Sequence, residues 1–252
     1  MSFDTGAELY QRFMGRYSEP LAVSFADVAE VAPGQRVLDV GCGPGALTAQ
    51  LVERLGPDNV AAVDPSAPFA EAAQARFPGV DVRVASAEDL PFPAESFDAT
   101  LAQLVVSFVH DPIAGLREMG RVTRPGGTVA ACVWDLAGGT SPLSTFWAAA
   151  RDLDPSVVDE SGVPGGRDHH LVELAQQAGL QDPVQSVLTV RVRHETFDEW
   201  WEPYTYGVGP AGDHAAGLDE AQRTALRDRC AELLGPAPFD VVGQAWCMRA
   251  TV

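Results

Sequence analysis

The fold is decided by residues 36–48, which read Arg36-Val37-Leu38-Asp39-Val40-Gly41-Cys42-Gly43-Pro44-Gly45-Ala46-Leu47-Thr48. The stretch begins with a short apolar run of strand type, continues through alternating glycines, and ends in a helical pattern. Glycine accepts positive φ and lets another backbone or a ligand come close. A strand, a glycine turn and a helix in this order open the nucleotide-binding α/β folds. Asp39 interrupts the apolar strand, where a buried carboxylate is costly unless a polar partner requires it.

Composition and charge limit the classes of partner. A chain of 252 residues is long enough for one α/β domain, and its net charge is −18. Such a charge disfavours binding to nucleic acid or to an anionic membrane and suits a small-molecule substrate. All 17 basic residues are arginine. The absence of lysine excludes Schiff-base catalysis and a phosphate-binding P-loop lysine.

The four cysteines show no paired spacing of the kind that binds zinc, and they predict free thiols in a reducing cytosol. The N-terminal residues carry no secretory pattern, and no apolar run reaches the ~20 residues that span a bilayer. We therefore expect a cytoplasmic protein. A cluster of His169, His170 and Glu173 fits the first turn of a helix capped by Asp168 better than a metal site, and we predict no metal.

Five short strands alternate with helices along the first half of the chain, which predicts a parallel sheet with right-handed crossovers. We expect strands at residues 37–40, 60–63, 81–84, 97–103 and 128–134, with a tight turn at 124–127. A helical pattern over 6–31 is expected to divide at Pro20. Later strands are expected at 184–193 and 237–252, separated by a helical insertion over 195–236 with helices at 196–207 and 219–234.

The glycine loop satisfies a dinucleotide fingerprint, with Gly41, Gly43 and Ala46 at its small positions, and Asp64 ends the next strand where a ribose-binding acid is expected. Any adenosine-containing cofactor fits this much. A pyrophosphate needs free N–H groups at the helix N-terminus, and here Pro44 removes one donor while Asp39 adds a negative charge. A cationic ligand such as a sulfonium would instead be attracted by Asp39.

These motifs resemble those of the class I S-adenosylmethionine-dependent methyltransferases, in particular the ubiquinone/menaquinone-biosynthesis group. The resemblance rests on residues 37–45, on Asp64-Pro65-Ser66, on the run 87–98 and on 116–127, and it covers residues 10–134 well. It implies a Rossmann-like α/β fold with a seven-stranded mixed sheet in the order 3-2-1-4-5-7-6. It also implies a single domain over 1–252, made of an N-terminal helical lid (1–32), a cofactor-binding core (33–135) and C-terminal strands with the insertion (136–252).

The resemblance also implies roles for individual residues around S-adenosylmethionine. The two glycines of the loop approach the methionine part and the ribose, Asp39 holds the loop and the amino group, and Asp64 binds the ribose hydroxyls. The backbone of Ala87 faces the adenine. Ser86 stands where the family often has an aspartate that binds the adenine amine. The expected cofactor-binding set is Asp39, Gly41, Cys42, Gly43, Asp64, Pro65, Ser66, Ser86, Ala87, Glu88 and Gln103.

The implied activity is methyl transfer from S-adenosylmethionine to a small-molecule acceptor, such as a quinone-like compound or a secondary metabolite, by a monomer or homodimer. His110 follows the fourth strand and is a candidate general base, although a histidine of a surface loop explains it better. Tyr17, Trp201 and Tyr204 are candidate acceptor contacts, and packing onto the sheet is the alternative for the aromatic pair. Two other functions stay open, a nicotinamide-dependent oxidoreductase and a non-catalytic protein that binds S-adenosylmethionine.

Overall fold

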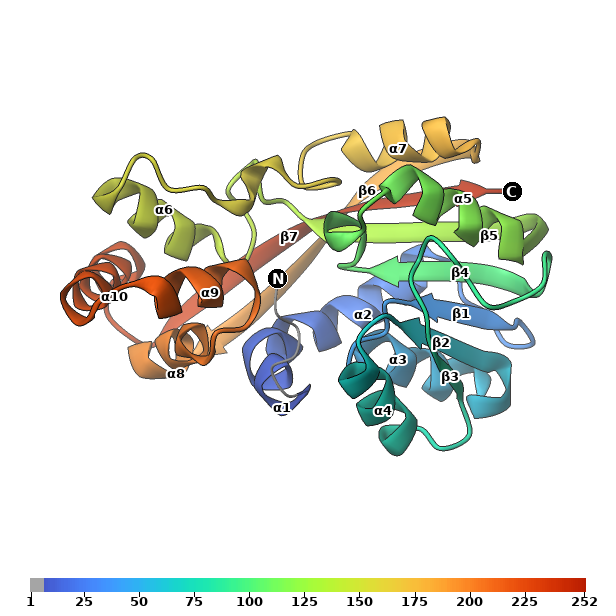
Figure 1. Ribbon diagram of the computed structural model, residues 1–252, viewed down its shortest axis with the longest axis horizontal. Coiled ribbons are helices and arrows are strands. Elements are labelled where there is room, and N and C mark those ends of the chain that lie inside the picture. Colours follow the sequence, from blue (N-terminus) through green and yellow to red (C-terminus); the bar gives the residue numbers. More distant parts are fainter. Residues whose placement is uncertain (1–6) are drawn as a thin grey trace.

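The computed structural model describes residues 7–252 and contains, within that range, one seven-stranded mixed sheet in the order β3-β2-β1-β4-β5-β7-β6. Strands β1 to β5 run parallel, and β7 pairs antiparallel with both β5 and β6 (Figure 1). The sheet order predicted from the sequence is therefore confirmed. The strands are β1 Val37–Val40, β2 Val60–Asp64, β3 Asp81–Val84, β4 Phe97–Gln103, β5 Thr123–Trp134, β6 Gln181–His194 and β7 Phe239–Thr251.

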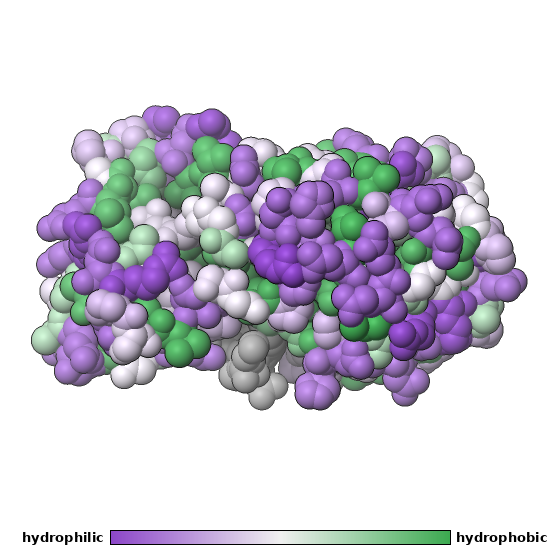
Figure 2. Space-filling model, turned by 90° about the horizontal axis from the view of Figure 1, so that it is seen from above, coloured by the Kyte–Doolittle hydropathy of each residue, from purple (hydrophilic) through white to green (hydrophobic). Residues whose placement is uncertain are grey.

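Helices cover both faces of the sheet, as the near-continuous apolar sequences of its central strands require. Every residue of β1 and of β2 is buried, and two separate apolar cores lie on the two faces. One face carries α2 Arg16–Val28, α3 Ala46–Leu55 and α4 Ala67–Arg76, and the other carries α5 Pro112–Val122 and α7 His170–Ala178. Figure 2 looks onto the side of α5 and α7, where hydrophilic residues cover most of the surface and hydrophobic ones form small groups between them.

The N-terminal segment is helical, but its irregularity lies before Pro20. A short helix α1 (Ala7–Tyr10) leads into a π-helical turn over Gln11–Gly15, and α2 then runs through Pro20 without a break. The predicted division at Pro20 is wrong because the proline falls in the second turn, where its missing N–H costs a single early hydrogen bond. Residues 1–6 of the predicted lid lie outside the described residues.

A second difference concerns the predicted tight turn at residues 124–127, which lies inside β5. The pairing of β4 with β5 shifts register between Phe97 and Ala99, so the segment forms an irregular start to the strand. Gly126 has φ of 77°, and an added Cβ at Gly127 would lie 2.6 Å from the carbonyl oxygen of Asp98. The glycines thus permit a bulge that keeps the chain in the sheet.

The last two strands extend past the carboxyl ends of their neighbours and carry a group of helices on that extension (Figure 1). The predicted insertion between them contains α8 Phe197–Trp201, a 3-10 turn Glu202–Tyr206, α9 Gly209–Gly217 and α10 Glu220–Leu234. Helix α6 (Ser144–Leu153) packs against α10, where Arg229 pairs with Asp152 at 2.7 Å. Helix α9 has no counterpart in the sequence prediction, because its glycine-rich sequence reads as a turn.

Candidate active site

A crevice lies over the carboxyl ends of β1, β2 and β4, where parallel α/β sheets bind their ligands. It consists of two adjoining hollows, and we call it the glycine-loop crevice. Its lining includes Tyr10, Ser18, Asp39, Gly41, Cys42, Gly43, Pro44, Asp64, Pro65, Ser66, Phe69, Gln103 and Leu104. Most of the cofactor-binding residues predicted from the sequence therefore meet at one place.

The glycine loop is fixed to β2 and leaves its outer side open. The backbone N–H groups of Gly41 and Cys42 donate to the carbonyl oxygen of Val63 at 2.8 and 2.9 Å. An added Cβ at Gly41, whose φ is 71°, would lie 2.4 Å from the side chain of Val105. An added Cβ at Gly43, whose φ is 53°, would meet no atom within 4 Å. Gly41 is thus required by packing, whereas Gly43 leaves room for a ligand at the loop.

Two buried carboxylates border the crevice and have different partners. Asp64 accepts hydrogen bonds from the backbone N–H groups of Gly43 and Ser66, both at 2.8 Å, and so ties the end of β2 to the glycine loop. Asp39 accepts a 2.6 Å hydrogen bond from the hydroxyl of Thr48. Burial raises the pKa of Asp39 to about 7, against the effect of the Thr48 hydrogen bond, and burial also raises the pKa of Asp64. A cation in this crevice would favour the ionised form of both groups.

Several polar atoms at the crevice are buried without a partner. Gln103 donates its amide N–H to the carbonyl oxygen of Ser18 at 2.9 Å, but its Oε1 has no hydrogen-bond partner in the described chain. The hydroxyls of Ser18 and Ser66 share this condition. Buried polar atoms are rarely left unpaired in proteins, and each unpaired one costs about 1–3 kcal/mol. Their concentration at one crevice indicates a polar ligand.

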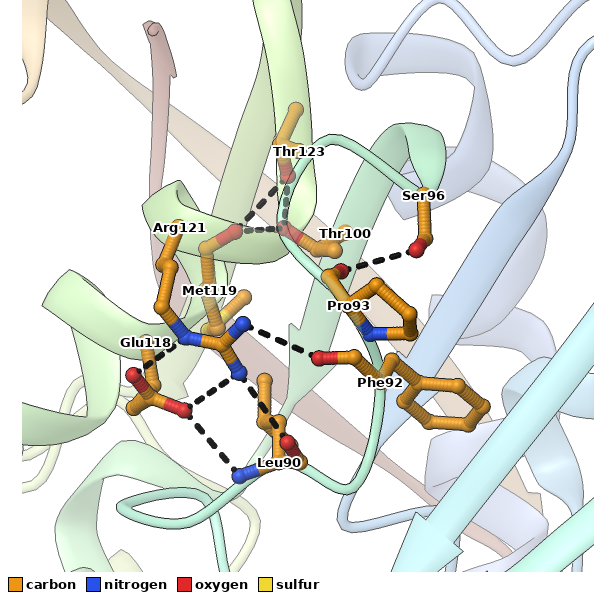
Figure 3. A network of polar contacts seen from close by, with 9 residues as sticks. All are labelled: Leu90, Phe92, Pro93, Ser96, Thr100, Glu118, Met119, Arg121 and Thr123. Carbon is orange, nitrogen blue, oxygen red and sulfur yellow. Dashed lines mark hydrogen bonds and ion pairs between the residues drawn. The ribbon is translucent and has the colours of Figure 1, made fainter.

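The loop after β3, predicted to bind adenine, is held against α5 by a polar network (Figure 3). Arg121 donates to the carbonyl oxygens of Phe92 and Leu90 at 2.9 and 3.0 Å, and Glu118 accepts from the N–H of Leu90 at 3.2 Å. Arg121 and Glu118 also bind each other at 2.7 Å. This network fixes the loop before any ligand enters. Sequence reasoning did not single out either charged residue.

Ser86, Ala87 and Glu88 lie in that loop, beside the crevice lining rather than in it. Ala87 is buried in the core under α5, and Ser86 is half-buried. The carboxylate of Glu88 accepts from the backbone N–H groups of His110 and Asp111 at 3.1 and 3.4 Å. Glu88 thereby links the predicted adenine loop to the segment that follows β4. The adenine contacts of this loop stay a prediction.

His110 lies at the surface, and neither cavity described here has it in its lining. Its backbone N–H is bound by Glu88. A general base must lie within hydrogen-bond reach of the proton it removes. The position of His110 therefore gives no support to that role.

A second cavity, mostly apolar, adjoins the crevice. We call it the apolar cavity. Most of its walls come from the N-terminal segment, the ends of β4 and β5, and the start of α9. The lining residues are Tyr10, Phe13, Met14, Leu104, Ser107, Phe108, Val133, Trp134, Leu136, Leu143, Glu160, Val208, Gly209, Pro210 and Ala211. The two cavities share Tyr10, Leu104 and Phe108.

The predicted acceptor contacts Tyr17, Trp201 and Tyr204 are all buried, and none of them borders this cavity. The hydroxyl of Tyr17 lies 2.9 Å from Nε2 of His194 and joins α2 to the end of β6. The ring of Tyr204 packs against Phe13 with centroids 4.9 Å apart, and Phe13 does line the cavity. Tyr204 thus contacts the cavity only indirectly, through the wall residue Phe13. Among the lining residues that sequence reasoning missed are Val208, Gly209, Pro210 and Ala211, whose composition carries no signal of a binding wall.

Comparison with known proteins agrees with this geometry. Residues 38–131, from β1 to β5, match the family described as "Methyltransferase domain". The segment from β1 to β5 is thus a methyltransferase domain. The matched segment holds the glycine loop, Asp64 and Gln103. Within residues 7–252, no helix is long and apolar enough to cross a membrane, and no group of three or more histidine, cysteine or acidic residues is arranged to hold a metal ion.

Two curated relatives and one solved structure place the methyltransferase domain among known proteins. It is 34% identical over 149 residues to 2-methyl-6-phytyl-1,4-hydroquinone methyltransferase 2 of Oryza sativa subsp. japonica, a match that covers 58% of this chain and 39% of the relative. It is 34% identical over 135 residues to nocamycin O-methyltransferase of Saccharothrix syringae, a match that covers 51% of this chain and 48% of the relative. The chain thus spans half or less of these relatives.

The solved structure is that of geranyl diphosphate methyltransferase in complex with S-adenosylmethionine, which has a TM-score of 0.55 and 18% identity and covers 94% of this chain and 86% of that one. At that identity the likeness concerns the fold. It extends beyond the segment matched by the family and includes most of the C-terminal part.

Proposed function

We propose that the chain binds S-adenosylmethionine in the glycine-loop crevice and transfers its methyl group to a small-molecule acceptor held in the apolar cavity. The observation that carries the proposal is the junction of the two cavities at Tyr10, Leu104 and Phe108. One cavity presents buried carboxylates and unpaired polar atoms, and the other is apolar. Methyl transfer needs both, since a charged donor and an uncharged acceptor must meet in a place that excludes water.

The residues of the crevice suit the parts of this cofactor. The carboxylate of Asp64 has lone pairs beyond those that bind Gly43 and Ser66, and a ribose presents hydroxyl donors to such an acid. The unpaired Oε1 of Gln103 and the buried Asp39 suit an ammonium group. When bound, the cofactor supplies a sulfonium methyl group that a nucleophile displaces.

The chain's own part in the reaction is to position the two reactants and to keep water away. Burial and the charge of Asp64 raise the pKa of Tyr10 to about 12, so this phenol stays neutral between the two cavities. Leu104, in the left-handed conformation with φ of 61°, borders both cavities directly after β4. A non-glycine residue in this region is uncommon and persists only where its surroundings hold it. Alignment and desolvation of this kind are recognised sources of rate in displacement reactions.

A nicotinamide-dependent oxidoreductase is less well supported. A dinucleotide places its pyrophosphate at the N-terminus of the helix after the glycine loop. In this chain that helix, α3, begins beside the buried Asp39, whose carboxylate binds Thr48 within the helix. The relatives named above are methyltransferases.

The cofactor assignment predicts a selective thermal shift. S-adenosylhomocysteine at about 100 times its Kd should stabilise the native protein by about 2.7 kcal/mol, because it binds only the folded state. NAD at the same concentration should leave the melting temperature unchanged. Differential scanning fluorimetry measures both. A shift with NAD alone would overturn the assignment, and consumption of S-adenosylmethionine over a panel of acceptors separates an enzyme from a non-catalytic binding protein.

The pKa of Asp39 predicts how affinity depends on pH. With that pKa raised to about 7 in the free protein, Asp39 is mostly protonated at pH 6 and mostly ionised at pH 8. The ionised form attracts a cationic ligand, so S-adenosylmethionine should bind up to about tenfold more weakly at pH 6 than at pH 8. Calorimetry on the wild type and on Asp39→Asn separates this effect from titration of the ligand. If affinity changes with pH to the same extent in both proteins, Asp39 does not control the pH dependence of binding.

A further inference from the structure

The apolar cavity contains one carboxylate, that of Glu160, and its burial is unusual. Glu160 begins a short 3-10 turn between α6 and α7 and is 6% exposed. Carboxylates are seldom buried unless they are paired, because desolvation of the charge is costly. The lining of this cavity contains no arginine or histidine, and the chain has no lysine. Glu160 therefore lacks a cationic partner on the cavity.

Among the described residues, the side chain of Glu160 makes a single hydrogen bond. Its Oε2 accepts from the indole N–H of Trp147 in α6 at 2.8 Å. An ionised carboxylate accepts up to about four hydrogen bonds, so most of its capacity is unused. Burial raises the pKa of Glu160, the Trp147 hydrogen bond lowers it, and the nearby Asp159 raises it. Glu160 also borders a smaller hollow lined by Ser144, Arg151 and Ser161.

Trp134, which also lines this cavity, carries a buried donor without a partner among the described residues. The indole Nε1 of Trp134, at the end of β5, is buried and has no hydrogen-bond partner in the described chain. Among apolar walls, the lining residues thus include a buried donor and an underused acceptor, together with the hydroxyl groups of Tyr10 and Ser107. A hydroxyl group suits such a lining, because its O–H donates and its oxygen accepts. An ammonium group can only donate, and a carboxylate would be repelled by Glu160.

We propose that Glu160 determines the specificity of the apolar cavity by accepting a hydrogen bond from a hydroxyl of an uncharged, largely apolar acceptor. The inference rests on the proposed function and names its substrate class. It predicts that a flat aromatic alcohol binds better than its methyl ether, which has the same body without the O–H. A hydrogen bond to a charged group gives a preference of at least about tenfold.

The test uses 2-naphthol, 2-methoxynaphthalene and 2-naphthoate as probes, with Kd measured by calorimetry on the full chain at pH 7, with and without S-adenosylhomocysteine. The wild type should prefer 2-naphthol over the ether by at least about tenfold and should bind 2-naphthoate most weakly. Glu160→Leu should bind the alcohol and the ether equally. Glu160→Gln keeps the shape of the side chain and an acceptor oxygen, so it should retain a reduced preference for the alcohol over the ether. This variant replaces Glu160→Leu in the test if the leucine variant does not fold.

Trp147→Phe is the matched control, because it removes the indole N–H that donates to Glu160, and Trp147 is not among the residues that line the cavity. It should keep the preference for the alcohol. The proposal is overturned if the wild type binds alcohol and ether equally, if it binds none of the probes, or if the preference survives Glu160→Leu. Loss of the preference in Trp147→Phe would also overturn the proposal, because it would show that the preference depends on the contact of Glu160 with α6 rather than on Glu160 itself. Failure to bind S-adenosylhomocysteine with the preference intact would instead count against the proposed function alone.

Discussion

Replacement of Gly43 with leucine should weaken binding of S-adenosylhomocysteine by at least about 100-fold. Gly43 lines both hollows of the crevice, and the position of its missing Cβ is open space. A leucine there would fill the volume that the ligand needs and would block its approach to the loop backbone. The φ of 53° adds a folding cost of about 1–2 kcal/mol for any side chain. Calorimetry measures the affinity, and a thermal melt confirms that the variant is folded.

Gly34→Leu is a control for the backbone cost alone. Gly34 has φ of 91°, an added Cβ there would also meet no atom within 4 Å, and the residue is exposed in the loop before β1. That loop lies at the opposite end of β1 from the crevice, so affinity should stay within about twofold while stability falls. Equal loss of affinity in the two variants would show that Gly43 affects binding only through the fold.

The central part of the fold was predictable because its signals are local. The apolar runs of β1 and β2 are short, bounded by glycine or proline, and too hydrophobic for a surface strand, which favours a buried parallel sheet. The same stretch places Asp39, Gly43 and Asp64 at the ends of adjacent strands, and all three border the crevice. Side chains at carboxyl ends of parallel strands meet in space wherever the sheet order is known. The order of the last two strands came from the family resemblance.

The wall of the apolar cavity was not predictable, because tertiary packing decides it. Helix α9 contains three glycines and a proline, which disfavour a helix in isolation. Helix α9 is stabilised instead by burial of Ala211 and Ala215 in the apolar core on the α2 and α3 face of the sheet. The aromatic residues Trp201 and Tyr204 show the converse case. Large rings gain most from complete burial, and in this fold they fill the core behind Phe13.

Glu160 escaped sequence reasoning for a different reason. It lies in a run of polar and small residues, Asp159-Glu160-Ser161-Gly162, that is typical of an exposed loop. Nothing local distinguishes it from its neighbour Asp159, whose carboxylate pairs with Arg151. The two carboxylates differ in their partners, since Asp159 pairs with Arg151 whereas Glu160 accepts from the indole of Trp147. Burial of a single charged residue in a loop depends on contacts between distant segments, and no periodic pattern reports it.

Asp64→Ala should weaken S-adenosylhomocysteine binding by at least about 100-fold and should also remove the discrimination between ribose and deoxyribose. The variant lacks the carboxylate that is expected to accept two hydrogen bonds from ribose hydroxyls, each of about 1.5–3 kcal/mol. It also lacks the acceptor of the Gly43 N–H, which ties the glycine loop to β2. Asp58→Ala is the matched control, since this exposed aspartate precedes β2 and its removal changes the net charge equally. It should leave affinity within about twofold.

Comparison of S-adenosylhomocysteine with its 2′-deoxy analogue separates the two roles of Asp64. If the carboxylate binds the ribose, the wild type prefers the ribose form by about tenfold or more, and Asp64→Ala binds both forms alike. If Asp64 serves only to hold Gly43 and Ser66, the variant weakens both ligands equally and the preference persists. The second outcome would move the ribose contact to another group of the crevice, and the unpaired hydroxyl of Ser66 is the nearest polar atom in sequence that remains.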